Sequence, residues 1–306
     1  IISDFRLNTA NATLLNVADA TTLGEQALQK IGFTLDEARV ITASLIDAEL
    51  CGYPALGLAR ILTISEHRNF KKPRTPIRIE YETPMSARMD GGNYPGFYAV
   101  TQAAMLAIEK AKTAGVAWVG CRYSNHAGPA SLYARKPLEH DMLGLYFAVG
   151  NANHLPPWGG MDMLLSTNPI AAGIPAGDEP PVVLDMATTV AAYGKVKVKA
   201  KRGEMMPEGW MIDRQGQPLL DPHRSHEGFL LPIGEHKGYG LALMVGILAG
   251  TLGGAAMGRD VIDFNADHQS VTNTGQAILV LDLKAFAEPE QFKASIDKLI
   301  RDIRGS

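Results

Sequence analysis

The sequence has little cysteine and no surplus of charge of either sign. Its 306 residues include two cysteines, Cys51 and Cys121, and no CxxC pair. These counts exclude a disulfide framework and a zinc ribbon, and they favour a reducing, cytoplasmic compartment. The formal net charge is -3, from 29 basic and 32 acidic side chains. We expect no nucleic-acid partner, because binding a phosphate backbone requires a basic surplus.

Long apolar runs and the common nucleotide-binding loops are also missing. The longest apolar run, residues 241–252, is shorter than the roughly 20 residues that span a membrane, so we expect no membrane partner. Neither G-x-G-x-x-G after a strand nor G-x-x-x-x-G-K-[ST] occurs, which disfavours a Rossmann or P-loop site. The 31 glycines nevertheless make up about 10% of the chain, above the average near 7%. This excess indicates loops that approach a ligand closely.

Residues 1–70 are predicted to be helical. Thr22 with Glu25, and Thr34 with Glu37, have the spacing of capping boxes, which predicts two helix starts. Apolar residues at helical spacing follow the second box, and a glycine and a proline after residue 50 end this helix.

Strands and helices follow one another in the rest of the chain. Residues 72–97 contain short alternating strand patterns and turns, which mark a domain boundary. A helix over 100–113, ended by Gly115, leads into a buried strand over 116–119. Buried strands are also predicted over 143–149 and 182–184, a strand over 277–283, and helices over 237–252 and 289–304. Residues 151–235 are rich in proline and glycine, so we expect an irregular and functional backbone there.

The first candidate site segment is residues 122–129, directly after the buried strand. The sheet would fix the position of His126, and Gly128 would admit a ligand. Histidine exchanges a proton near neutral pH, as reversible carbonyl reduction requires. The alternative is a hydrogen-bonded loop histidine without chemistry.

Three further stretches have side chains that suit a ligand. Residues 151–160 and 166–169 supply asparagine and threonine donors and acceptors, or they form an ordinary turn-rich crossover. In residues 184–189 a strand ends at Asp185, where backbone N–H groups and threonines suit a ribose or phosphate; Asp185 is equally suited to cap a helix. Residues 231–240 begin a helix whose N-terminus, with Lys237, favours an anion, or they form a capped surface helix.

Four residues that lie close in sequence are of types that bind metals: His223, His226, Glu227 and His236. Pro222 and Gly228 interrupt any regular helix there, so the spacing does not pre-set a metal geometry, and we expect no metal.

Four lysines alternate along the chain at positions 195, 197, 199 and 201. This pattern is typical of the solvated face of an edge strand or a helix, and a role beside a cofactor phosphate is the alternative.

Five segments occur in a characteristic order: Asp-Ala-Glu-Leu-Cys-Gly at 47–52 with Arg60, Ser-Asn-His-Ala-Gly at 124–128, Ser-Thr-Asn-Pro at 166–169, Leu-Asp-Met-Ala-Thr at 184–188, and Pro-Ile-Gly-Glu-His-Lys-Gly-Tyr-Gly-Leu at 232–241. Together they resemble the type 2 malate/L-lactate dehydrogenase family, NAD(P)-dependent reductases of 2-oxo acids and cyclic imino acids. The resemblance covers nearly the whole chain.

The resemblance implies a mixed α/β fold that binds the dinucleotide without a Rossmann motif. Its large sheet would be mixed and mainly antiparallel. We accordingly expect a helical N-terminal domain over 1–80, joined by the C-terminal helix 288–306, and an NAD(P)-binding and catalytic domain over 81–287. The family resemblance also implies a homodimer.

The resemblance assigns roles to individual residues. Arg60 and Thr167 would contact a small carboxylate substrate, and guanidinium grips a carboxylate through two hydrogen bonds. His126 matches the acid/base histidine of the ureidoglycolate dehydrogenase branch. The cofactor, NADH or NADPH, is expected to contact residues from four segments: Gly128, Asn151, Asp185, Met186, Ala187, Glu235, His236 and Lys237.

One segment departs from the family pattern. Many members have Ser-His-Gly four residues before the substrate arginine, whereas this chain has Ala-Leu-Gly at 55–57. Leu56 cannot donate a proton, and Lys195 stands where the imino acid reductases have an aspartate. The proton would come from His126, from His154 (also a candidate substrate contact), or from Lys195.

These residues predict an NAD(P)H-dependent oxidoreductase that interconverts a small 2-oxo (or cyclic 2-imino) carboxylate and its 2-hydroxy (or amino) acid. The alternative is a dinucleotide- or metabolite-binding homologue that lost catalysis together with the usual proton donor at position 56.

Overall fold

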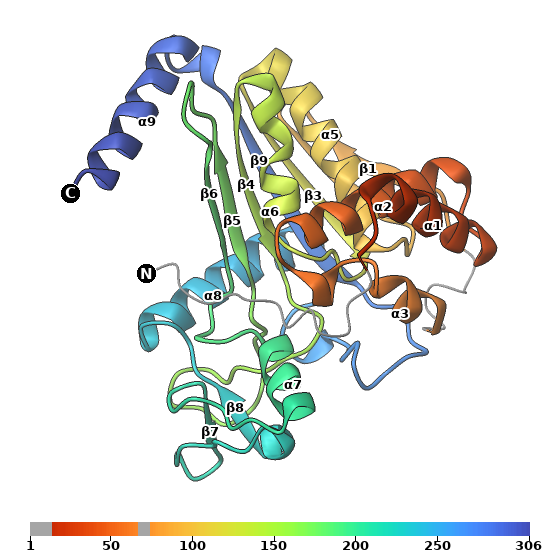
Figure 1. Cartoon of the computed structure of the whole chain (residues 1–306), viewed down its shortest axis with the longest axis vertical. Coiled ribbons are helices and arrows are strands. Elements are labelled where there is room, and N and C mark those ends of the chain that lie inside the picture. Colours follow the sequence, from red (N-terminus) through yellow and green to blue (C-terminus); the bar gives the residue numbers. More distant parts are fainter. Residues whose placement is uncertain (1–13, 67–73) are drawn as a thin grey trace.

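The computed structural model describes residues 14–66 and 74–306, built around a seven-stranded sheet in the order β1-β2-β3-β9-β4-β5-β6 (Figure 1). β2 and β3 are parallel, and the other neighbouring pairs are antiparallel. The predicted mixed, mainly antiparallel sheet is therefore confirmed. The strands are β1 Arg78–Glu82, β2 Ser86–Asp90, β3 Val116–Ser124, β4 Met142–Ala148, β5 Ile170–Ile174, β6 Val182–Met186 and β9 Thr274–Asp282.

Two helices cover opposite faces of this sheet. α5 (Gly96–Ala114) buries a row of alanines against β3 and β9, and these small side chains let the helix lie close to the strands. α8 (His236–Ala249) packs Val245 against Phe147 of β4. The neighbouring Tyr146 belongs to the core on the α5 side, because successive side chains of a strand point to opposite faces.

α2 (Leu35–Leu50) packs on α5 and begins where the sequence predicts it. The Thr34 hydroxyl accepts a hydrogen bond from the Glu37 N–H at 3.3 Å, and the Glu37 carboxylate accepts one from the Thr34 N–H at 2.9 Å. The capping box at Thr34 is therefore confirmed.

α1 (Val17–Lys30) begins earlier than predicted. Asn16 caps it by accepting a hydrogen bond from the Asp19 N–H at 2.8 Å. Thr22 lies inside the helix, and its hydroxyl donates to the Ala18 carbonyl at 3.0 Å. The predicted start at Thr22 is wrong, because an upstream residue already satisfies the free N–H groups. The parts of the predicted helical region at 1–13 and 67–70 lie outside the described residues.

β6 forms one edge of the sheet, and its side chains are exposed in the single chain. Val182, Val183 and Leu184 keep 39%, 41% and 43% of their surface accessible. The prediction of a strand at 182–184 is confirmed, but its predicted burial is wrong: successive side chains point to opposite faces of the sheet, and the described residues cover neither face at this edge.

The C-terminal helix α9 (Pro289–Arg304) lies far from α1 and α2 in Figure 1. Its buried Asp297 accepts hydrogen bonds from the N–H groups of Gly177, Asp178 and Glu179, between β5 and β6. This contact fastens α9 to the sheet. The division into domains at residue 80 stays a prediction.

Residues 193–230 form a small lobe at the lower end of the molecule in Figure 1. It contains α7 (Tyr193–Arg202), a two-stranded sheet of β7 (Met211–Asp213) and β8 (Gly228–Leu230), and a small apolar core of its own.

The remaining elements are short: η1 Pro54–Leu56, α3 Arg60–Glu66, α6 Ser131–Ala134, η2 Lys136–His140, η3 Pro222–Glu227, η4 Thr251–Gly253, η5 Gly258–Asp260 and η6 Leu283–Ala285. Within the described ranges, no helix combines the length and the apolar character needed to cross a membrane.

Candidate active site

Arg60 and His126 lie on one pocket, although they are far apart in the sequence. Arg60 begins α3, and His126 follows the end of β3. Ile64, Pro95, Phe97 and Phe264 line the same pocket, so its walls are largely apolar. A charged group and a proton-exchanging group thus share an apolar pocket, which is the arrangement expected of a small-molecule site.

The guanidinium of Arg60 has unused hydrogen-bonding capacity. Its buried Nε has no hydrogen-bond partner, and no ion pair links Arg60 to a carboxylate within residues 14–66 and 74–306. Burial lowers the pKa of Arg60 from its usual value. A half-buried guanidinium with an unbonded Nε is costly, so the site suits an anionic ligand, and a carboxylate matches the guanidinium fork.

One ring nitrogen of His126 is hydrogen-bonded within the protein, and the other is available to a ligand. Its Nδ1 accepts a hydrogen bond from the Gly128 N–H at 3.2 Å, which places the proton of the neutral ring on Nε2. The rings of Phe97 and Phe264 lie 6.3 and 6.2 Å from the imidazole. Burial, and then the charge of Arg60, lower the pKa of His126 to about 3. The resting ring is therefore neutral at physiological pH.

A buried polar network fixes the segment that carries His126. Asn125 donates to the Asn93 Oδ1 at 3.2 Å and to the Tyr94 carbonyl at 3.1 Å, and it accepts from the Thr272 hydroxyl at 2.6 Å. Because Asn125 is buried and bonded on both sides, His126 has little freedom to move.

Gly128 is required at its position for two reasons. Its φ is +73°, a backbone conformation that side-chain-bearing residues rarely adopt. A Cβ there would also lie 2.5 Å from the Phe97 ring. This glycine lets the loop pass close to the pocket wall.

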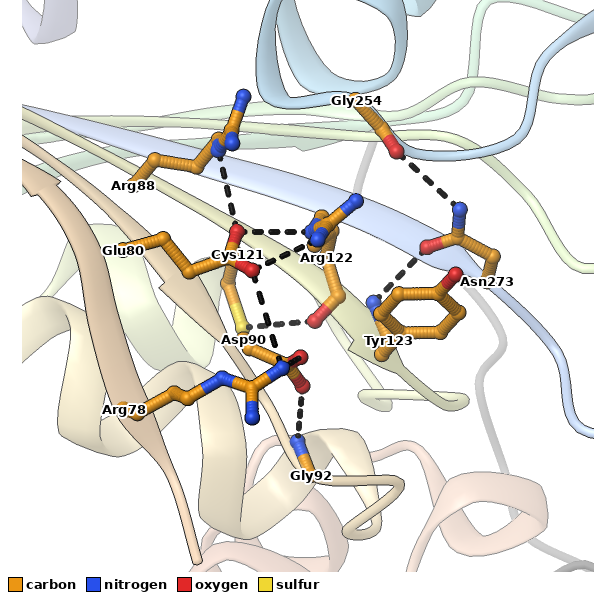
Figure 2. Close-up of polar contacts among 10 residues, drawn as sticks. All are labelled: Arg78, Glu80, Arg88, Asp90, Gly92, Cys121, Arg122, Tyr123, Gly254 and Asn273. Carbon is orange, nitrogen blue, oxygen red and sulfur yellow. Dashed lines mark hydrogen bonds and ion pairs between the residues drawn. The ribbon is translucent and has the colours of Figure 1, made fainter. Parts of the chain in front are cut away.

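The end of β3 that leads to His126 is anchored by charged side chains (Figure 2). Arg122 donates to both carboxylate oxygens of Glu80, at 2.8 and 2.6 Å, and Arg88 donates to the same carboxylate at 3.1 Å. The hydrogen bond from Arg122 is the main cause that holds the pKa of Glu80 below its usual value. The Tyr123 N–H donates to Asn273 at 2.9 Å. These contacts tie β3 to its neighbours.

His154 lies in a second cluster beside the first pocket. Its ring stacks on Tyr193 of α7, with 4.1 Å between the centroids. Burial is the main cause that lowers the pKa of His154 to about 4, while the charge of Asp263 opposes the shift. The ammonium of Lys197 lies 5.6 Å from the Tyr193 ring and donates to Asn265 at 2.7 Å.

The structure places Lys197, and not Lys195, in this cluster. Lys195 is exposed on α7. Side chains two positions apart on a helix are separated by about 200° around the helix axis. Lys195 and Lys197 therefore lie on nearly opposite sides of α7, and only one of them can face His154. The alternating lysines predicted a strand or helix face, and the helical period is the signal that separates Lys197 from Lys195.

Two further residues of the site, Phe264 and Asn265, had no sequence signal. They lie in the loop before β9, where Phe264 lines the pocket and Asn265 meets Lys197. The Phe264 N–H donates to the Asn151 carbonyl at 2.8 Å, and the Asn151 side chain donates to the Thr274 hydroxyl at 2.8 Å. Asn151, a predicted cofactor contact, thus holds this loop against the pocket.

Backbone hydrogen bonds bring three of the predicted segments together. The Thr188 N–H donates to the Thr167 carbonyl at 2.9 Å, and the Ile233 N–H donates to the Thr188 carbonyl at 3.0 Å. The segments 166–169, 184–189 and 231–240 therefore lie side by side, with Thr167, Met186, Ala187 and Glu235 among them.

Asp185 is a strand residue and does not cap a helix. It lies in β6, and its carboxylate accepts hydrogen bonds from the N–H and the hydroxyl of Ser131, at 2.9 and 2.6 Å. The helix-cap alternative is wrong for this residue. The carboxylate joins β6 to α6, which follows the His126 loop.

The start of α8 has the donors that a phosphate requires. His236 and Lys237 are exposed there, and no side chain caps this helix end in the described structure. Glu235 has a φ of +59°, which is rare for a residue with a side chain. Uncapped N–H groups, the helix dipole and Lys237 together suit an anion, so this helix start fits the pyrophosphate of a dinucleotide.

Within the cluster of His223, His226 and Glu227, the acidic side chain has another partner. Arg224 forms an ion pair with Glu227 at 2.6 Å in an exposed turn. Among the residues with described positions, no group of three histidine, cysteine or acidic side chains is arranged to hold a metal.

Residues 15–306 match the family described as malate/L-lactate dehydrogenase. The L-sulfolactate dehydrogenase of Methanothermobacter thermautotrophicus is 34% identical over 89% of this chain and 79% of its own length. The malate dehydrogenase of Pyrococcus horikoshii is 35% identical over 92% and 79%. The names of two further relatives specify NADP(+) and NAD(+).

The solved structures agree with the sequence relatives. The sulfolactate dehydrogenase from Methanocaldococcus jannaschii superposes with a TM-score of 0.87 and 32% identity, covering 96% of this chain and 85% of the other.

Proposed function

The chain belongs to the malate/L-lactate dehydrogenase family, and we propose that it reduces a small 2-oxo carboxylate to the 2-hydroxy acid with NADH or NADPH. It is an NAD(P)-dependent oxidoreductase by this membership. The observation that carries the assignment of the site is that Arg60, whose buried Nε has no hydrogen-bond partner, lines one pocket with His126.

Arg60 would hold the substrate carboxylate through two charge-assisted hydrogen bonds. This contact sets the orientation of the neighbouring carbonyl, and it gives the buried Arg60 Nε a hydrogen-bond acceptor. Thr167 and His154 are the further substrate contacts that we propose.

His126 would act on the carbonyl oxygen through Nε2, since Nδ1 is engaged by Gly128. To act as an acid the ring must first take up a proton at Nδ1, in place of the hydrogen bond from Gly128. In the reductive direction this imidazolium passes its Nε2 proton to the carbonyl oxygen as negative charge develops and is left as the neutral ring with its proton on Nδ1. In the oxidative direction the same neutral ring accepts the hydroxyl proton at Nε2. The apolar rings of Phe97 and Phe264, which lie beside the imidazole, strengthen this interaction by lowering the local dielectric constant. Acid–base help of this kind contributes about 10²–10⁴-fold to a rate.

The cofactor supplies hydride chemistry when bound. The start of α8, with His236 and Lys237, is proposed to hold its phosphates, and Glu235 lies at the same turn. Gly128, Asn151, Asp185, Met186 and Ala187 are the other proposed contacts. Lys195 is a further proposed catalytic residue, as an alternative proton donor to His126, although its side chain is exposed on α7.

The loss of absorbance at the NADH or NADPH band tests this function. Pyruvate, glyoxylate, oxaloacetate and a cyclic imino acid are mixed with protein and each cofactor. We expect turnover with at least one 2-oxo acid. Cofactor binding without turnover across the panel would instead favour a non-catalytic homologue, in keeping with Leu56 at the position of the usual donor.

We further propose a cytoplasmic homodimer that binds neither nucleic acid nor membrane. The free cysteines Cys51 and Cys121 and the net charge of -3 support the compartment and the lack of a nucleic-acid partner. The exposed apolar edge strand β6 supports a second copy as its cover, because such edges otherwise pair indiscriminately. Sedimentation equilibrium tests the dimer, and a monomer at micromolar concentration would overturn it.

A further inference from the structure

Lys197 lies close enough to Arg60 for the two positive charges to interact, and together they exceed what one substrate carboxylate requires. Of the described side chains whose charges act on Lys197, Arg60 and Lys201 are cationic and Asp263 is acidic. His126 and His154 are both neutral at physiological pH, because burial lowers the pKa of each. A ligand that carries two negative charges would balance this surplus.

Lys197 is held in place by one hydrogen bond, and its ammonium can donate further ones. Its ammonium has three N–H donors, and Asn265 is its one hydrogen-bond acceptor within the described residues. The Asn265 amide is itself held by Asp263, which accepts from it at 3.2 Å and from the backbone N–H of the same residue at 2.7 Å. Two donors of Lys197 therefore remain for a ligand.

The loop that meets Lys197 also closes the pocket. Asn265, which accepts from Lys197, directly follows Phe264, and the Phe264 ring lines the pocket and stacks at 6.2 Å on His126. Lys197 is thus tied to the wall of the Arg60 pocket, while its residue remains exposed to an incoming ligand.

We propose that Lys197 is a specificity-determining substrate contact, which binds a second anionic group of a 2-oxo acid whose first carboxylate is held by Arg60. This inference rests on the proposed function of the pocket. It assigns to the enzyme a preference for dianionic 2-oxo acids, with a carboxylate or sulfonate beyond the carbonyl, over monoanionic ones of equal size.

The experiment compares oxaloacetate with 2-oxobutyrate, which replaces the second carboxylate by a methyl group. Steady-state kinetics are measured for wild type, Lys197→Gln, and the matched control Lys201→Gln, one helical turn away on α7. Removing a hydrogen bond to a charged group costs about 10- to 100-fold in binding. We expect Lys197→Gln to lower kcat/KM for oxaloacetate by about that factor, mainly through KM, and to leave 2-oxobutyrate unchanged.

Three outcomes overturn the proposal. Equal losses for both substrates would mean that Lys197 only positions the Phe264 loop, and Asn265→Ala should then reproduce them. A weaker Kd for NADH or NADPH in Lys197→Gln would mean that the ammonium binds a cofactor phosphate. An equal loss of kcat/KM for oxaloacetate in Lys201→Gln would mean that the effect comes from long-range electrostatic attraction and not from a direct contact of Lys197.

Failure of the proposed function is recognised separately. If wild type turns over neither substrate while it binds cofactor, the reductase assignment fails first. If wild type turns over both equally well, the reductase assignment stands and the role of Lys197 is wrong.

Discussion

The guanidinium of Arg60 and the imidazole of His126 line the same pocket, and the charge of Arg60 adds to burial in lowering the pKa of His126. Carboxylate binding would neutralise Arg60 and so remove one of these two causes. The substrate would thereby raise the proton affinity of the residue that must transfer a proton to it. Binding and proton transfer are coupled through this one contact.

Arg60→Gln removes the charge and tests this coupling. The pKa of His126 should rise in the free enzyme, and kcat/KM for a 2-oxo acid should fall by about 10- to 100-fold, because the carboxylate loses a charge-assisted contact. NMR titration of the His126 ring measures the first effect. Arg60→Lys is the matched control, which keeps the charge but loses the planar fork, so the pKa should stay low while KM rises. An unchanged His126 titration in Arg60→Gln would contradict the coupling.

Acid should destabilise the fold through His126 and His154. Each has a pKa near 6.5 when unfolded and a lower one when folded, about 3 and about 4. The unfolded chain therefore binds more protons between these values, and stability present above pH 6.5 is lost as pH falls toward 4. Urea unfolding at pH 7 and pH 5 measures the loss. His154→Gln should lose less stability than wild type over this interval, and an identical loss would count against the prediction.

Gly128→Ala should be more harmful than an alanine at another left-handed glycine. Gly128 has a φ of +73° and would place its Cβ 2.5 Å from the Phe97 ring, whereas Gly159 has a φ of +79° with open space around it. We expect losses of about 3 kcal/mol for Gly128→Ala and about 1 kcal/mol for Gly159→Ala. Denaturant unfolding measures both. Equal losses of unfolding free energy in the two variants would mean that the Phe97 ring moves aside without an energetic penalty.

Lys237→Gln should weaken cofactor binding about tenfold, because an ammonium at a helix N-terminus attracts the dinucleotide phosphates. Fluorescence of bound NADH measures its Kd. Lys284→Gln, an exposed lysine after β9, is the charge-matched control and should leave this Kd unchanged. The same Kd in Lys237→Gln and wild type would remove the start of α8 from the cofactor site.

Local chemistry predicted much of the fold. Thr34 and Glu37 satisfy each other's backbone N–H groups, so the start of α2 follows from four adjacent residues. Gly115, with a φ of +78°, ends α5 for a similarly local reason. Strand β6 was predicted as a strand from its apolar run, but its exposure depends on its place at the sheet edge, and strand order is a long-range property.

The site was only partly predictable. His126 follows a strand and precedes a glycine, and both signals are local. Lys197 could not be separated from Lys195 until α7 was known to be a helix, because a strand period puts both lysines on one face. Phe264 reaches the pocket through a loop that is held by Asn151, more than a hundred residues earlier, and no sequence pattern reports such a contact.

The central claim, that His126 transfers the proton, is tested most directly by single-turnover reduction of a 2-oxo acid by enzyme-bound NADH. In His126→Ala the rate of NADH oxidation should fall by about 10²–10⁴-fold, while the Kd for NADH stays near its wild-type value. A near-wild-type single-turnover rate in this variant would contradict the account and move the proton donor to His154 or Lys195.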